Sequence, residues 1–253
     1  MSTDREHEIT RAFVSIANSM VDGADVVDLL SGLTSDCARL LDIASAGLLL
    51  ADGNGVLHVL AASSERTRDL EIFQLQRDEG PCRDCFHSGQ QVSVNDLSQE
   101  TDRWPQFVAA ATAAGFAAVH ALPMRLRGTT LGALNLFGAK VGALAADDLD
   151  LAQALAHVAS IALVTDKAAG DKETLNQQLQ TALTSRVAIE QAKGFLAQLG
   201  DLDMDQAFAV LRRHARDHNA RLSEVAQQLV SRKLAVQQLL DDHSTAKVDV
   251  RPR

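Results

Sequence analysis

Cys82 and Cys85 lie three residues apart, and of the residues in this sequence their type and spacing best suit a chemical role. A C-x-x-C pair can act as a redox couple, and the adjacent Arg83 would favour the reactive thiolate. Zinc needs four ligands, and only His87 lies nearby in the sequence. The segment therefore indicates either a redox sensor or thiols that line a pocket, and we expect no metal site.

Other catalytic patterns are missing from the sequence. It contains no Gly-rich phosphate loop with Lys, no nucleophile elbow and no H-E-x-x-H. No two carboxylates have a spacing that suggests acid and base roles. His58 and His120 lie within apolar segments, which is typical of core histidines whose hydrogen bonds are satisfied. We therefore expect no catalytic residue and no enzyme activity.

A second group of candidate residues is cationic and lies near the C-terminus. Arg186, Glu190 and Lys193 follow one another at helical spacing, so their side chains should converge on one exposed patch. The simpler alternative is a solvated helix face with an Arg186–Glu190 ion pair. Arg212 and Arg216 are predicted to be exposed on the next helix. Together these cations would form one positively charged surface suited to a polyanion.

The elements that must position the cysteines alternate between helices and hairpins. Apolar periodicity predicts helices at 5–21 and from an Asp25 N-cap. Turn residues at 52–55 and 127–128 each separate two apolar runs, which predicts two β-hairpins. Helices are expected at 66–76, after Pro105 and at 147–166, and a long loop at 79–97 with a short strand at 91–94. This order predicts an α+β domain built on an antiparallel sheet with flanking helices.

The C-terminal part has only helical periods, at about 172–199, after Asp203 and from Leu222. In the first helix the apolar arc shifts along the chain, so this helix should contact two partners. Its upstream residues have coiled-coil spacing, and its downstream residues should pack on the next helices. Phe195 and Phe208 are expected in that core. An all-α three-helix domain follows from this pattern.

Charge is divided between the two parts. The whole chain has a net charge of −9, but residues 172–240 hold nine Lys and Arg against seven Asp and Glu, a net +2. Residues 1–171 therefore carry −11. Only the C-terminal part is suited to meet a polyanion. The longest apolar runs are too short to cross a bilayer, and no signal peptide is visible, so we expect a cytoplasmic protein without a membrane partner.

The C-terminal stretch from LTSRVAIEQAKGFLAQ to SEVAQQLV closely resembles the ANTAR family of RNA-binding antiterminator domains over about 60 residues. The matching positions are Ser185-Arg186, Ile189 through Gly194, Ala207-Phe208, Leu211-Arg212, Ala215-Arg216, Asn219 and Val225-Ala226. The resemblance implies binding to paired hairpins in a nascent leader transcript and control of its termination. The RNA-binding residues it points to, with the adjacent Arg213, are Arg186, Gln191, Lys193, Gly194, Arg212, Arg213 and Arg216.

The order of elements in residues 25–165 resembles GAF domains, as found before ANTAR domains in actinobacterial proteins. This resemblance implies a sensor pocket between the sheet and the loop that carries Cys82, Cys85 and His87. We assign His120 to the same pocket. The ligand would be an unknown small molecule or a redox signal.

These inferences predict a GAF-like domain at 1–166, a helical linker at 167–181, an ANTAR-like domain at 182–240 and a flexible tail at 241–253. A homodimer through the helices at 5–21 and 147–183 would let a signal place two RNA-binding domains on two hairpins.

Two alternative functions stay open. The last two helices could form a helix-turn-helix that binds DNA, although the would-be recognition helix has no basic residue before Arg232. The second alternative is a redox enzyme, because some GAF domains reduce methionine sulfoxide through cysteines.

Overall fold

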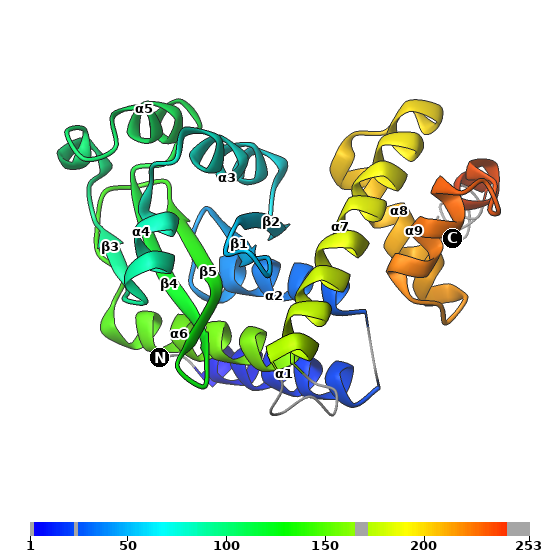
Figure 1. Ribbon diagram of the computed structural model, residues 1–253, viewed down its shortest axis with the longest axis horizontal. Coiled ribbons are helices and arrows are strands. Elements are labelled where there is room, and N and C mark those ends of the chain that lie inside the picture. Colours follow the sequence, from blue (N-terminus) through cyan, green and yellow to red (C-terminus); the bar gives the residue numbers. More distant parts are fainter. Residues whose placement is uncertain (1–2, 23–24, 165–171, 242–253) are drawn as a thin grey trace. The chain divides into compact units, whose positions relative to one another are not determined.

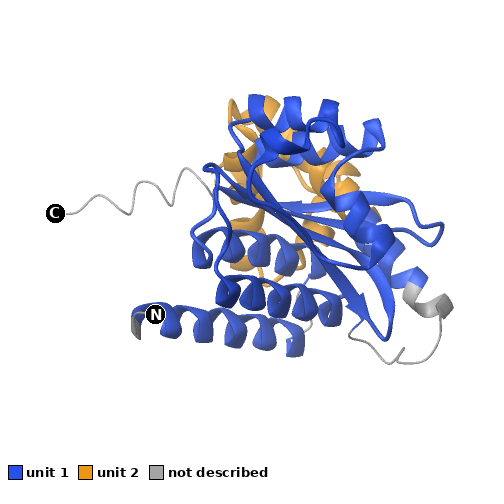
Figure 2. Ribbon diagram, turned by 90° about the vertical axis from the view of Figure 1, so that its left-hand side faces the viewer, with its two compact units in different colours: residues 1–183 blue, residues 184–253 orange. Residues whose placement is uncertain are grey.

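The computed structural model describes residues 3–22, 25–164 and 172–241. The chain divides into two compact units, residues 1–183 and residues 184–253 (Figure 2). This division lies inside a helix, near the predicted start of the ANTAR-like domain at 182. Residues 167–171 of the predicted linker and 242–253 of the predicted tail lie outside the described residues. The other predicted boundaries stay predictions.

The first unit is built on a five-stranded antiparallel sheet (Figure 1). The strands are β1 (Ser45–Ala51), β2 (Leu57–Ala62), β3 (Val92–Val94), β4 (Ala118–Leu126) and β5 (Thr129–Gly138), in the order β2-β1-β5-β4-β3. Both predicted hairpins are present. At the β4–β5 turn Arg127 and Gly128 have φ of 50° and 84°, as the tight turn of a two-residue hairpin requires. The predicted α+β fold is confirmed.

Helices cover both faces of this sheet (Figure 2). On one face lie α2 (Val26–Leu40) and α6 (Ala146–Ala162), with α1 (Thr3–Val21) packed against α2. The opposite face is covered by α3 (Glu65–Arg77), α4 (Pro81–Ser88) and α5 (Pro105–Ala113), and a short 3-10 helix spans Leu97–Glu100. The Asp25 N-cap is confirmed, because its side chain accepts hydrogen bonds from the N–H groups of Val27 and Asp28.

The prediction of a loop at 79–97 is wrong for its first half, where the structure has α4. Pro81 occupies the first turn of this helix, where its missing N–H costs nothing, and Gly89 ends the helix in the left-handed conformation. The Gly and Pro residues therefore cap a helix. Its eight residues are too short for apolar periodicity to be visible.

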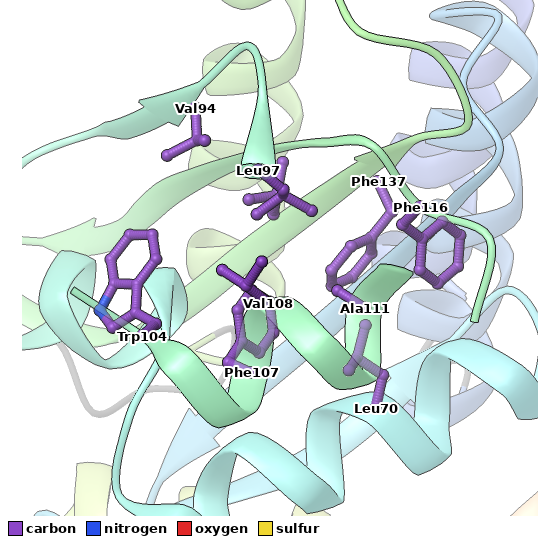
Figure 3. Close-up of a cluster of buried hydrophobic side chains, with 10 residues drawn as sticks. Leu70, Val94, Leu97, Trp104, Phe107, Val108, Ala111, Phe116 and Phe137 are labelled. Atoms are coloured by element: carbon purple, nitrogen blue, oxygen red, sulfur yellow. The ribbon is translucent and has the colours of Figure 1, made fainter. Parts of the chain in front are cut away.

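Alternate residues of a strand face the same side of the sheet, and the side covered by α3, α4 and α5 holds two clusters of buried residues. One cluster under α3 and α5 includes Trp104, Phe107, Phe116 and Phe137 (Figure 3). Phe116 and Phe137 lie with ring centroids 4.9 Å apart. A neighbouring cluster includes the two cysteines of α4 together with Leu49, Ala121 and Ala133. The face with α3 and α4 thus holds both the aromatic core and the candidate sensor residues.

After the sheet domain come α7 (Lys172–Gly200), α8 (Met204–Asp217) and α9 (Leu222–Val230), and the described residues 236–241 are also helical. Asp203 and Gln206 form a capping box at the start of α8. Apolar faces of α8 and α9 meet through buried residues such as Leu211 and Leu229. The helix predicted at 147–166 ends at Ala162, and residues 165 and 166 lie outside the described residues.

Candidate functional sites in the two units

The cations of α7 surround one carboxylate. Arg186 Nη2 lies 2.6 Å from Glu190 Oε1, and Lys193 Nζ lies 3.2 Å from each oxygen of the same group. Arg186 is 8% exposed and Lys193 is 3% exposed. The prediction that these heads form an exposed patch is therefore wrong: the three residues converge, but they do so under the surface.

Their burial follows from the helix geometry. At 100° per residue, Arg186 and Lys193 lie together along one edge of the stripe of Ile189, Ala192 and Leu196, which is fully buried. Long basic side chains readily cover apolar neighbours with their methylene stems. Because that stripe packs inward, Arg186 and Lys193 are drawn in with it, and both pair with Glu190.

The exposed arc of α7 carries no charge among the residues from 184 to 199. It consists of Thr184, Val187, Gln191, Gly194, Phe195, Gln198 and Leu199. Phe195 is 45% exposed, so its prediction as a core residue is wrong. Gly194 has open space where a Cβ would lie, as a close backbone approach requires. Gln191 and Gly194, two of the residues carried over from the ANTAR resemblance, therefore lie at the surface.

The basic residues of α8 reach the surface to different degrees. Arg212 and Arg213 are half-buried and Arg216 is exposed, and the three fall within about a third of the helix circumference at 100° per residue. Lys193 Nζ lies 5.5 Å and Arg212 Cζ 5.8 Å from the ring centroid of Phe208. The basic residues of α7 and α8 thus meet at Phe208, and those of α8 continue to the surface.

The two cysteines of α4, Cys82 and Cys85, face the core. Both are fully buried. Burial raises the pKa of Cys85 to about 12, and burial together with the nearby Glu71 raises the pKa of Cys82 well above its usual range. Arg83 does not counter this, because its Nε lies 2.6 Å from Asp78 Oδ1. The expectation that Arg83 favours thiolate is therefore wrong.

The four predicted sensor residues are not brought together. His87 is exposed on α4, and its Nδ1 lies 2.8 Å from the carbonyl of Arg83. His120 precedes Ala121 on β4, and Ala121 packs on the cysteines, so His120 faces the opposite side of the sheet. In the described part of the chain no three His, Cys, Asp or Glu residues are grouped to hold a metal ion.

Sequence reasoning missed a buried polar cluster beside Cys82. Glu71 of α3 is fully buried and accepts a hydrogen bond from Asn135 Nδ2 at 2.7 Å and another from Gln74 Nε2. Burial raises the pKa of Glu71 to about 8, against the two hydrogen bonds that lower it. Gln74 Oε1 and Asn135 Oδ1 have no hydrogen-bond partner. The Glu71 carboxyl group, mostly protonated near neutral pH, thus lies among amides between α3 and the sheet.

The signal for this cluster in the sequence is weak. Glu71 and Gln74 are spaced i, i+3 on a helix that also buries Leu70, which places polar residues next to an apolar stripe. Gly47 of β1 faces Glu71 so closely that a Cβ there would collide with the carboxyl. Only the packing of α3 on the sheet shows that these polar residues lie inside.

The architecture and sites define a sensor-type α+β domain joined to a helical unit with basic residues at its surface. Known protein families support this division. A GAF domain model matches residues 23–164, and an ANTAR domain model matches residues 177–230. The chain belongs to the GAF domain family and carries an ANTAR domain.

The chain is similar to solved GAF domain structures, and the one from Acinetobacter agrees with the fold of the first unit. The GAF domain of an Acinetobacter phosphoenolpyruvate-protein phosphotransferase is 14% identical, with a TM-score of 0.52, and the match covers 68% of this chain and 99% of that one. A GAF domain region of a putative membrane protein from Geobacter sulfurreducens is 22% identical, with a TM-score of 0.47 and coverage of 59% and 97%. No curated protein matches the sequence.

An ANTAR domain is an RNA-binding antitermination domain and a GAF domain is a sensor, so the two together indicate a sensor and regulatory protein. Among the helices of the described ranges, none is both long and apolar enough to span a membrane.

Proposed function

We propose that this protein is a signal-responsive regulator that binds paired hairpins in nascent leader RNA and controls transcription termination. The observation that carries the proposal is the ANTAR match at residues 177–230, with the arginines of α8 turned toward the surface. Such a protein would act in the cytoplasm, where the transcript is made. Its assignment to the actinobacterial type is part of the same proposal.

The geometry changes the roles of the proposed RNA-binding residues. Arg212, Arg213 and Arg216 would neutralise phosphates, and Gln191 and Gly194 would meet the RNA from α7. Arg186 and Lys193 are buried around Glu190, so we assign them to positioning α7 against Phe208. Exposed Phe195 adds an aromatic surface on which an unpaired loop base could stack.

A homodimer remains part of the proposal, with a change in its contacts. Leu179 and Leu183 of the predicted coiled-coil stripe are already buried within a single chain. Val14 of α1 and Ile161 of α6 are 53% and 46% exposed and are therefore available to a second copy. Dimerisation would bring two ANTAR domains to two hairpins on one transcript.

Neutralisation of the α8 arginines tests the proposal. RNA crosslinked to the protein in cells identifies a hairpin, and its affinity is then measured for the parent and for R212Q/R213Q/R216Q. We expect a loss of at least about tenfold near 0.1 M salt and a shallower salt dependence, by about one unit of log–log slope for each lost phosphate contact.

The matched control neutralises three exposed arginines of the first unit, R11Q/R77Q/R127Q, and should leave affinity unchanged. Equal affinity of the α8 variant and the control for the hairpin would refute the proposal. Competition by duplex DNA as strong as by hairpin RNA would instead favour the helix-turn-helix alternative. The α9 surface carries Glu224, Gln227 and Gln228, which does not favour DNA phosphates.

A further inference from the structure

A cavity of about 480 Å³ lies at the sheet face opposite the cysteines. It is bounded by the loop between α2 and β1, by β4 at Ala118 and His120, and by the segment that leads from β5 to α6. Its volume falls within the range of small-molecule sites, roughly 300–1,000 Å³. Neither Cys82, Cys85 nor Glu71 lines it.

His120 is a polar group of this cavity that is buried and unsatisfied. It is 3% exposed, and its Nδ1 is buried without a hydrogen-bond partner. Burial lowers the pKa of the imidazole, which favours its neutral form. Buried polar atoms are nearly always paired, so an unpaired one that lines a cavity is suited to hydrogen-bond a small molecule there.

The remaining lining residues combine one charge of each sign with apolar groups. Lys140 and Asp42 are both exposed and line the cavity with Ile43, Val141 and Leu144. A carboxylate bound here would pair with Lys140 and draw a proton onto His120, which gives it a second positive partner. An amine would pair with Asp42 and would gain from His120 only an uncharged acceptor, whereas a carboxylate gains a second cation. The Asp42 carboxylate also disfavours a second negative charge on the ligand.

We propose that this cavity binds a small monocarboxylic acid with an apolar body, whose carboxylate lies between His120 and Lys140. The segment from Gly138 to Leu144 lines the cavity directly before α6 begins at Ala146. Gly142 N–H donates to the carbonyl of Asn95 at 2.9 Å, which anchors this segment to the end of β3. A bound acid thus contacts the connection into α6.

Titration calorimetry of the full chain with benzoate and hexanoate tests the site, with benzamide and benzylamine as neutral and cationic counterparts. We expect both acids to bind at least about tenfold more tightly than the other two probes, and phthalate, a dianion, to bind more weakly than benzoate. K140Q should lower the affinity for benzoate about tenfold, and H120F should abolish benzoate binding. D42N should raise the affinity for phthalate more than the affinity for benzoate.

H87F is the matched control, because His87 is exposed on α4, and it should bind benzoate as the parent does. K140Q changes an exposed residue and keeps the test valid if H120F fails to fold. Benzoate should also raise the pKa of His120 measured by NMR. Absence of binding by both acids, or equal binding of benzoate by K140Q and the parent, would overturn the proposal. Hairpin affinity is measured separately, so failure here leaves the RNA proposal standing.

Discussion

Two glutamates, one in each unit, are kept away from water in different ways. Glu71 of the GAF domain is fully buried between the amides of Gln74 and Asn135, and its pKa is raised to about 8. Glu190 in the ANTAR domain has a side chain 15% exposed and lies within 3.2 Å of both Arg186 and Lys193. One carboxyl is held by neutral donors and the other by two cations.

The difference shows how each unit offsets the desolvation penalty of a buried carboxyl group. Without a cation, the cheaper solution is to keep the proton on Glu71, which makes the GAF core polar but uncharged. Near the surface of a small helical unit, full charges are tolerable when they are paired. The first solution depends on pH and the second on the presence of every partner.

The largest expected effect concerns Glu71 and pH. Its folded-state pKa of about 8 exceeds the ordinary value of 4.5, so the folded state binds a proton that the unfolded state lacks between those values. The stability contributed by this group is complete below about pH 4.5 and falls by roughly 1.4 kcal/mol per pH unit up to about pH 8. Urea unfolding followed by Trp104 fluorescence measures this in the GAF domain.

E71Q is the comparison variant, because glutamine cannot ionise. The difference in unfolding free energy between parent and E71Q should shift in favour of E71Q as pH rises from about 4.5 to about 8. Parallel pH dependence of the two proteins would show that Glu71 is ionised in the folded state, and the contrast with Glu190 would disappear.

The second effect is the loss of the charge shared by the α7 cations. E190Q leaves Arg186 and Lys193 buried without that carboxylate, which should destabilise the ANTAR domain by about 3 kcal/mol. Hydrogen exchange of the α7 and α8 amides reports this locally. E224Q, at an exposed position on α9, should change exchange little. Similar exchange in both variants would mean that the buried pairs contribute nothing.

A smaller effect tests how tightly the Glu71 site is built. G47A places a methyl group against the Glu71 carboxyl and should destabilise the GAF domain by about 2 kcal/mol. G138A is the matched control on β5, where the nearest atoms lie 3.4 Å from the added Cβ. Urea midpoints of the two variants should therefore differ, and a harmless G47A would indicate a loosely packed cluster.

The smallest effect is local to α8. D203A removes the acceptor for the Gln206 N–H, which lies 2.7 Å from Asp203 Oδ1, and should cost about 1 kcal/mol. D203N keeps an acceptor and should be nearly neutral. Hydrogen exchange of the first turn of α8 distinguishes the two. Equal protection in D203A and the parent would show that the cap is not needed.

The sequence alone determined the features that depend on neighbours along the chain. Caps at Asp25 and Asp203, the turn at Arg127-Gly128 and the apolar stripes are local, because their hydrogen bonds and periodicity join residues a few positions apart. The α+β order and the three-helix unit followed from these elements. The ANTAR and GAF resemblances were visible for the same reason.

Only the tertiary structure decided which side chains are buried together. Periodicity placed Arg186 and Lys193 on one helix face, but their burial depended on how that face packs. Alternation placed His120 and Ala121 on opposite faces of β4, yet the face that the cysteines occupy depended on where α4 crosses the sheet. Glu71 meets Asn135 across 64 positions of sequence. Such long-range contacts set burial, and burial sets the charge state and access of each group.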